Sequence, residues 1–190
     1  MSDRRLPVRP DLRQLKVQAK EFLRALRRGD PEAVATLRRH HPGDVAPSEA
    51  KLADAQLVLA RAYGVRSWPR LVLACRVTDA IWRDHVEGLR ELIVANPGLL
   101  HEPANGREAS DWGPPMTYAA NLGRDDVIDM LRELGARDFA SAAGRAALQG
   151  YVGTARRLHA PERRDRKRPV RISQGRKRPR TSAGGTGQTS

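Results

Sequence analysis

The chain has 190 residues, enough for one well-buried domain. Hydrophobic residues make up 39% of it but aromatic residues only 4%, so we expect a core of Ala, Leu and Val and no β-sandwich. The formal net charge is +13, yet residues 161–190 alone hold ten Arg and Lys against two acidic residues. The rest of the chain is therefore only mildly basic.

A single cysteine, Cys75, excludes an intramolecular disulfide and favours a reducing compartment. The sequence begins without the apolar segment of a secretory signal, and no apolar run is long enough to span a bilayer. We therefore expect a cytoplasmic protein without membrane contact. Cys75 follows Leu71 and Val72 on an apolar stripe, with no cation or His placed to lower its pKa. We expect a buried structural thiol.

The first two helices are predicted from caps and periodicity. Residues 1–10 show no helical period, and we predict a flexible N-terminus there. Asp11 suits an N-cap, and apolar residues then recur every three or four positions until Gly29. Asp30 caps a second helix, and Pro31 occupies its first turn, where a missing N–H loses no hydrogen bond.

Two further helices complete a predicted N-terminal helical region, residues 11–75. The third helix is expected from about Glu49 to Tyr63, ended by Gly64, and Ser67 can cap the fourth.

One spacing occurs four times along the chain. In each copy an Ala lies four residues before a turn residue, and apolar residues follow the turn at five and eight. The copies are Ala25, Gly29, Val34, Leu37; Ala80, Asp84, Leu89, Leu92; Ala119, Gly123, Ile128, Leu131; and Ala146, Gly150, Ala155, Leu158. Each copy predicts two short helices packed back to back, which must stack on neighbours to bury both faces.

Residues 115–136 read PMTYAANLGRDDVIDMLRELGA and resemble an ankyrin repeat. Pro115, Met116 and Ala119 take the places of Pro, Leu and Ala in the ankyrin opening T-P-L-H-x-A, and Thr117 stands at the His position. The matches to the usual continuation are Gly123, Val127, Leu131 and Gly135-Ala136. Residues 51–71, with Asp54-Ala55-Gln56-Leu57 and Ser67-Trp68-Pro69-Arg70-Leu71, resemble the helical lead-in of bacterial ankyrin-type proteins.

The resemblance implies an all-α, ankyrin-like stack at residues 76–160, preceded by extra helices. Ankyrin arrays usually bind other proteins through finger loops and the concave face of their inner helices. The implied function is non-catalytic protein–protein interaction, with another protein as partner. The turn-to-turn distance is 39 residues between Asp84 and Gly123 but 27 between Gly123 and Gly150. An extended finger loop is therefore expected over Glu102–Pro115. Almost no loop is expected before the last pair of helices.

Four residues are candidates for partner contact. Tyr118 and Asn121 flank the Ala119-Ala120 packing pair and are expected to be exposed and to face the groove. Trp82 lies two residues before the turn residue Asp84, just as Asn121 lies two residues before Gly123. We therefore expect Trp82, Tyr118 and Asn121 to form one patch. Trp112 lies at the base of the long loop, where it either anchors a partner or packs beneath the loop.

Other chemistry finds little support in the sequence. The five histidines show no metal-binding spacing, and GxSxG, GxGxxG and Walker motifs are missing. No nucleophile, acid and base converge, so we expect no enzyme, no cofactor and no metal. Residues 161–190 are expected to be a disordered basic tail, and their abrupt loss of pattern suggests a truncated or frame-shifted end. The alternative function is weak nucleic-acid or polyanion binding through this tail.

Overall fold

The computed structural model describes residues 4–107 and 110–159, and every regular element in these ranges is a helix. In chain order they are α1 (Leu12–Arg27), α2 (Pro31–His40), α3 (Leu52–Ala62), α4 (Trp68–Trp82), α5 (Val86–Ala95), the 3₁₀ turn η1 (Pro97–Leu100), α6 (Pro115–Asn121), α7 (Asp125–Glu133), α8 (Phe139–Leu148) and α9 (Val152–His159). The all-α prediction is confirmed for these residues, whereas the predicted tail at 161–190 lies outside them. Among the described helices, none has the length and apolar character that crossing a bilayer requires.

Side-chain caps start the first two helices where the sequence predicts. The Asp11 carboxylate accepts hydrogen bonds from the backbone N–H groups of Arg13 and Gln14, at 2.7 and 3.4 Å. The Asp30 carboxylate accepts from the backbone N–H of Ala33 at 2.9 Å, directly after the glycine turn. Each cap satisfies a backbone donor that has no partner inside its helix.

The four predicted turn residues all lie between two helices and all have a positive φ. The values are 72° for Gly29, 58° for Asp84, 65° for Gly123 and 81° for Gly150. Glycine adopts this left-handed conformation without steric cost, and Asp tolerates it better than most residues do. The repeated spacing therefore marks four helical hairpins, as expected.

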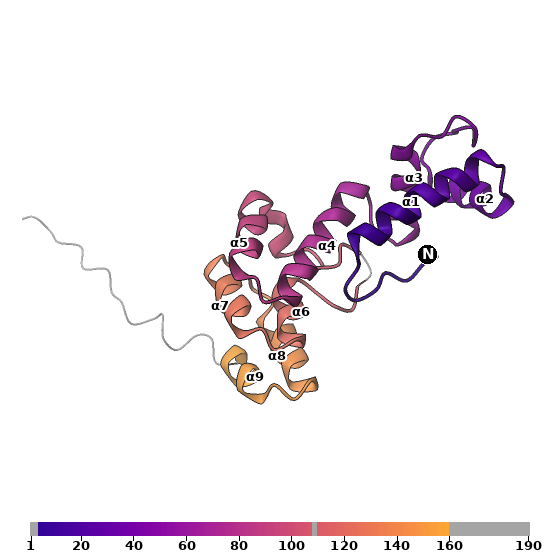
Figure 1. Cartoon of the computed structure of the whole chain (residues 1–190). Coiled ribbons are helices and arrows are strands. Elements are labelled where there is room, and N and C mark those ends of the chain that lie inside the picture. Colours follow the sequence, from indigo (N-terminus) through magenta and orange to yellow (C-terminus); the bar gives the residue numbers. More distant parts are fainter. Residues whose placement is uncertain (1–3, 108–109, 160–190) are drawn as a thin grey trace, which may run out of the picture.

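Three of these hairpins, α4–α5, α6–α7 and α8–α9, lie against one another in two rows (Figure 1). In the inner row α4 contacts α6 and α6 contacts α8, while α5 contacts α7 in the outer row. Small side chains let the inner helices approach closely, because Ala119, Ala120, Ala142 and Ala146 are all fully buried. The predicted Ala-rich core is therefore present between the inner helices.

Polar side chains tie each hairpin to the next. Arg124, at the turn of the second hairpin, donates through Nη2 to the carbonyl of Trp82 at 2.7 Å. The carboxylate of Asp138, ahead of the third hairpin, accepts from the backbone N–H of Thr117 at 3.0 Å and from its hydroxyl at 2.5 Å. Asp138 thus caps the N-terminus of α6 from outside that hairpin, which fixes the register of the two pairs.

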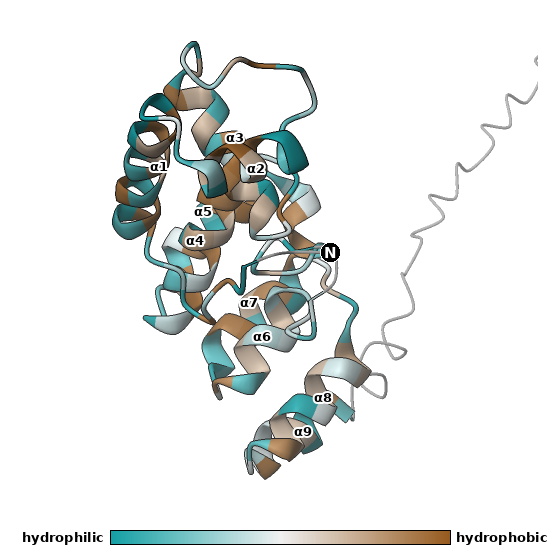
Figure 2. Cartoon of the chain, turned by 90° about the vertical axis from the view of Figure 1, so that its right-hand side faces the viewer, coloured by the Kyte–Doolittle hydropathy of each residue, from teal (hydrophilic) through white to brown (hydrophobic). Residues whose placement is uncertain are grey.

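Helices α1, α2 and α3 contact one another, and α3 contacts α4, at the end of the molecule away from α8 and α9 (Figure 2). The predicted boundary between residues 75 and 76 falls inside α4, which continues without interruption from Trp68 to Trp82. The apolar residues of α4 contribute to two hydrophobic cores. Leu71 and Cys75 belong to the core shared with α1 and α3, while Val77 and Ile81 belong to the core of the stacked hairpins.

Residues 4–10, here called the N-terminal segment, are ordered against three helices. The Arg4 backbone N–H donates to the carbonyl of Ala62 at 3.1 Å, and Leu6 is buried. The Val8 carbonyl accepts from the hydroxyl of Tyr118 at 2.9 Å. The expectation of flexibility over residues 1–10 is therefore wrong for 4–10, because long-range contacts hold a stretch that has no period of its own. Residues 1–3 lie outside the described ranges.

The expected finger loop between η1 and α6 folds back onto α4 in its described part. Arg70 on α4 is buried, and its Nε donates to Glu102 Oε2 at 2.7 Å while its Nη2 donates to the Pro103 carbonyl at 2.9 Å. Gly106 is also buried, and a Cβ placed there would lie 3.1 Å from the Cβ of Ala74. The long connection that the spacing predicts is therefore present between η1 and α6, and a buried arginine holds its described part against α4.

Candidate binding groove

Trp82 lies half-buried at the end of α4. The guanidinium carbon of Arg9 is 5.7 Å from the centre of its ring, in the geometry of a cation–π contact. Its carbonyl is held by Arg124. Part of the Trp82 ring is accessible, while the N-terminal segment covers one of its faces.

Tyr118 and Asn121 do not lie on the surface, and the expectation that they face an open groove is wrong. Tyr118 is fully buried and Asn121 is 9% exposed. Both belong to the short helix α6, which α4 and α8 cover from either side and whose Tyr118 hydroxyl reaches the N-terminal segment at Val8. Burial raises the pKa of Tyr118 to about 12, although the positive charge of Arg9 acts in the opposite direction.

Trp112 packs beneath the loop, as one of the two sequence interpretations expected. Its ring centre is 5.6 Å from that of Tyr118, with the planes inclined at 53°. The guanidinium carbon of Arg145, on α8, lies 6.0 Å from the Trp112 ring centre. The structure therefore joins Trp112 to Tyr118. Because Tyr118 and Asn121 are buried, they do not form the predicted surface patch with Trp82.

One hollow lies between the start of α1 and the exposed face of α4, and we call it the α1–α4 groove. It has a volume of about 740 Å³, which falls in the range of ligand-binding pockets. Five cationic side chains line it: Arg9, Arg13, Lys16, Arg76 and Arg83. Arg13 and Lys16 belong to α1 and Arg76 belongs to α4, while Arg83 directly follows α4 as its C-cap and Arg9 comes from the N-terminal segment.

Two carboxylates also line the α1–α4 groove, and both are already engaged. Asp79 lies 2.5 Å from Arg9 Nη2 and 3.1 Å from Arg83 Nε, while Asp11 caps α1. Within the described ranges Arg13, Lys16 and Arg76 have no acidic partner. The cationic excess of the groove is therefore carried by these three side chains, which are exposed.

Cys75 forms part of the floor of the α1–α4 groove. The side chain is only 3% exposed, and burial raises the pKa of its thiol to about 12, with Asp11 and Asp79 acting in the same direction. At neutral pH the group is a protonated thiol, which is a poor nucleophile. The prediction of a buried structural cysteine is confirmed.

A second hollow, of about 560 Å³, lies between the loop before α6 and the exposed face of α8. Its lining includes Ser110, Asp111 and Thr117 on one side and Gly144 and Leu148 on the other. The Leu148 side chain in this lining is 78% exposed.

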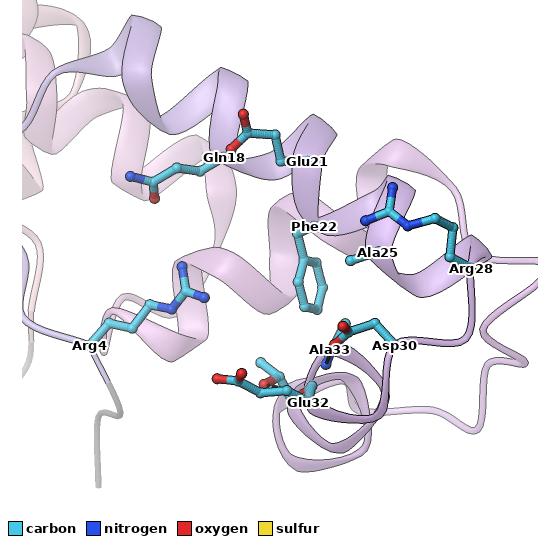
Figure 3. A pocket seen from close by; sticks show the side chains of 10 residues that line it. Arg4, Gln18, Glu21, Phe22, Ala25, Arg28, Asp30, Glu32 and Ala33 are labelled. Carbon is cyan, nitrogen blue, oxygen red and sulfur yellow. Dashed lines mark hydrogen bonds between the residues drawn. The ribbon is translucent and has the colours of Figure 1, made fainter.

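A third hollow of about 330 Å³ separates the N-terminal segment from α1 and α2, and Figure 3 shows Arg4 and Phe22 at its edges. Its charged lining is mixed, with two arginines and three carboxylates: Arg4, Arg28, Glu21, Asp30 and Glu32. This balance gives it no preference for a charged ligand. In the described part of the chain, no three His, Cys, Asp or Glu side chains converge as a metal site would require.

Sequence reasoning did not single out the cations around the α1–α4 groove. Arg76, Asp79 and Arg83 are spaced at three and four along α4, which marks one face of a helix. This spacing is visible in the sequence. The sequence does not reveal, however, that the start of α1 lies opposite this face of α4.

No protein-family model matches this sequence, and the comparisons with curated proteins and with solved structures gave no match either. The function must therefore be argued from the geometry of the helical stack and the surfaces described above.

Proposed function

We propose that the chain is a non-catalytic protein-binding module in which helix pairs of the ankyrin type present a rigid surface to another protein. The observation that carries this proposal is the stacking of α4, α6 and α8 in one row, with α5 and α7 in another. In a stack of short helix pairs, each pair contacts only the neighbouring pairs. Such arrays serve mainly as extended binding surfaces.

Support for rigidity comes from the polar contacts between successive pairs. Arg124 joins the second pair to the first, and Asp138 joins the third to the second. Thr154 on α9 donates to Asp125 on α7 at 2.6 Å, and Arg157 lies 3.3 Å from the same carboxylate. A surface held in one arrangement loses little conformational entropy when a partner binds.

Trp82 is the residue that we propose as an anchor for the partner. It is half-buried, and its ring lies under the guanidinium group of Arg9, a residue that lines the α1–α4 groove. Tryptophan and arginine are over-represented among residues that dominate binding energies. We assign Tyr118 only an indirect role, because it is fully buried and its hydroxyl holds the carbonyl of Val8, next to Arg9.

The test uses the full chain immobilised on a column and a lysate of its source cells. A retained protein is purified, and its Kd is measured for the natural chain, for Trp82→Ala and for the control Trp68→Ala, also half-buried but at the far end of α4. Loss of an interface anchor costs about 2 kcal/mol, or roughly thirtyfold in Kd. We expect that loss for Trp82→Ala alone, with little change in Tm.

Two results would overturn the proposal. A large fall in Tm for Trp82→Ala, with Kd unchanged after correction for unfolded protein, would make Trp82 a core residue only. Retention of nucleic acid instead of protein, abolished in a chain ending at Ala160, would favour the alternative in which residues 161–190 bind polyanions.

A further inference from the structure

The α1–α4 groove carries a charge imbalance that the fold does not use. Its two carboxylates are committed, Asp79 to Arg9 and Arg83, and Asp11 to the cap of α1. Arg13, Lys16 and Arg76 add nothing to the stability of the chain through ion pairs within the described ranges. Three exposed cations around one hollow repel one another, and a negatively charged ligand would relieve that repulsion.

We propose that the α1–α4 groove binds an acidic peptide segment, which on the proposed function belongs to the protein partner. The cations lie on two walls. Arg13 and Lys16 are three residues apart on one face of α1, and Arg76 projects from the facing side of α4. Carboxylates of a peptide lying along the groove meet cations on both sides.

The floor of the groove suits a peptide better than a charged ligand alone. Pro10, Leu12 and Cys75 line it together with the cations, so apolar side chains of the same segment find contacts between the charged ones. The volume of about 740 Å³ admits several side chains. Charge complementarity at the rim then provides orientation and fast association, while apolar burial provides affinity.

The same groove is poorly suited to nucleic acid. A phosphate backbone places negative charges at short, regular intervals, and Asp11 and Asp79 stand between the cations. Single-stranded bases need open aromatic faces for stacking, whereas the Trp82 ring is covered on one face by Arg9. A peptide can place its carboxylates to avoid the two aspartates, so the observations favour the acidic peptide.

The experiment measures fluorescence anisotropy of a labelled eight-residue peptide of Glu residues with one central Leu. The full chain is compared with the double variant Lys16→Glu/Arg76→Glu and with the control Arg24→Glu/Arg38→Glu, which changes net charge equally on exposed sites outside the groove. Equal net charge keeps any contribution of the basic residues 161–190 the same in both variants. A peptide with Gln in place of Glu and an eight-nucleotide oligothymidylate complete the set.

We expect the groove variant to weaken peptide binding by about tenfold or more at 150 mM salt, and the control by less than about threefold, since reversing close charges turns attraction into repulsion. The Gln peptide should bind weakly to all three proteins. Lys16→Gln/Arg76→Gln, expected to lose about half as much binding energy, keeps the test valid if charge reversal unfolds the chain.

Equal weakening in both double variants would overturn the inference, because the peptide would then be sensing net charge alone. A groove-specific loss for the oligothymidylate but not for the peptide would assign the groove to nucleic acid instead. If the purified partner of the preceding test binds both variants equally while the peptide shows no groove-specific loss, the inference fails and the proposed function stands. If the peptide binds the groove but no protein partner is found, the proposed function fails alone.

Discussion

The two glycine turns of the stacked hairpins differ in one respect that stability measurements can detect. Gly123 and Gly150 both have positive φ, at 65° and 81°. A Cβ at Gly150 would meet no atom within 4 Å, whereas a Cβ at Gly123 would lie 2.7 Å from Cε1 of Tyr151. Gly123→Ala should therefore destabilise the fold more than Gly150→Ala.

The magnitudes follow from two contributions. A left-handed Ala costs about 1–2 kcal/mol, and about 0.4–1 kcal/mol of this is recovered because the unfolded chain loses freedom, so Gly150→Ala should lower the free energy of unfolding by about 1 kcal/mol. At Gly123 the ring of Tyr151 must also move. Tyr151 is 41% exposed and can swing into solvent, so displacing it costs about 1 kcal/mol of buried aromatic surface and Gly123→Ala costs about 2 kcal/mol in all.

Urea denaturation followed by circular dichroism at 222 nm measures these free energies, and the double variant Gly123→Ala/Tyr151→Ala isolates the contact. When the Tyr151 ring is already removed, Ala at residue 123 costs only its backbone strain. The effects of the two substitutions on the free energy of unfolding should therefore differ from additivity by about 1 kcal/mol. Equal losses for the two glycine variants, or strict additivity in the double variant, would refute the packing of Tyr151 against the turn.

Three further outcomes are expected. Asp138→Ala should lower the free energy of unfolding by about 1–2 kcal/mol in urea titrations, because the Thr117 N–H loses its cap, and a loss no larger than that of Asp126→Ala would contradict the role. Cys75, with its thiol pKa raised to about 12, should resist a disulfide reagent at pH 8 until urea unfolds the chain, and fast native reaction would argue against burial. The pKa of Tyr118, raised to about 12, means that the folded state holds this proton while the unfolded state releases it above pH 10, so stability should fall between pH 10 and 12. Urea titrations over that range should show a smaller fall for Tyr118→Phe, and identical curves would count against the burial of the hydroxyl.

Local features of this fold could be predicted from sequence because neighbours along the chain decide them. Asp11 and Asp30 cap helices through N–H groups two or three residues away, and the turn at Asp84 is set by the spacing of the residues around it. Each of these needs only a few residues of context, which a repeated spacing supplies.

Contacts between distant residues could not be predicted in this way. The burial of Tyr118 could not be foreseen, because α4 and α8 pack around its helix and its hydrogen-bond acceptor, Val8, is 110 positions away in a stretch without a period. The length of the loop before α6 follows from the spacing of the turns, but nothing in its composition reveals that Arg70, on α4, holds it inward. The cations of the α1–α4 groove likewise come from two segments about sixty residues apart, and only the folded chain brings them together.

The continuity of α4 has a consequence for how the protein loses its structure. One half of this helix is shared with α1 and α3, and the other half belongs to the row of stacked hairpins. Neither half can melt without exposing apolar residues of the other, so denaturation should proceed as a single cooperative transition. A fragment beginning at Arg76 would start in the middle of this shared helix and leave half of its buried surface open to water.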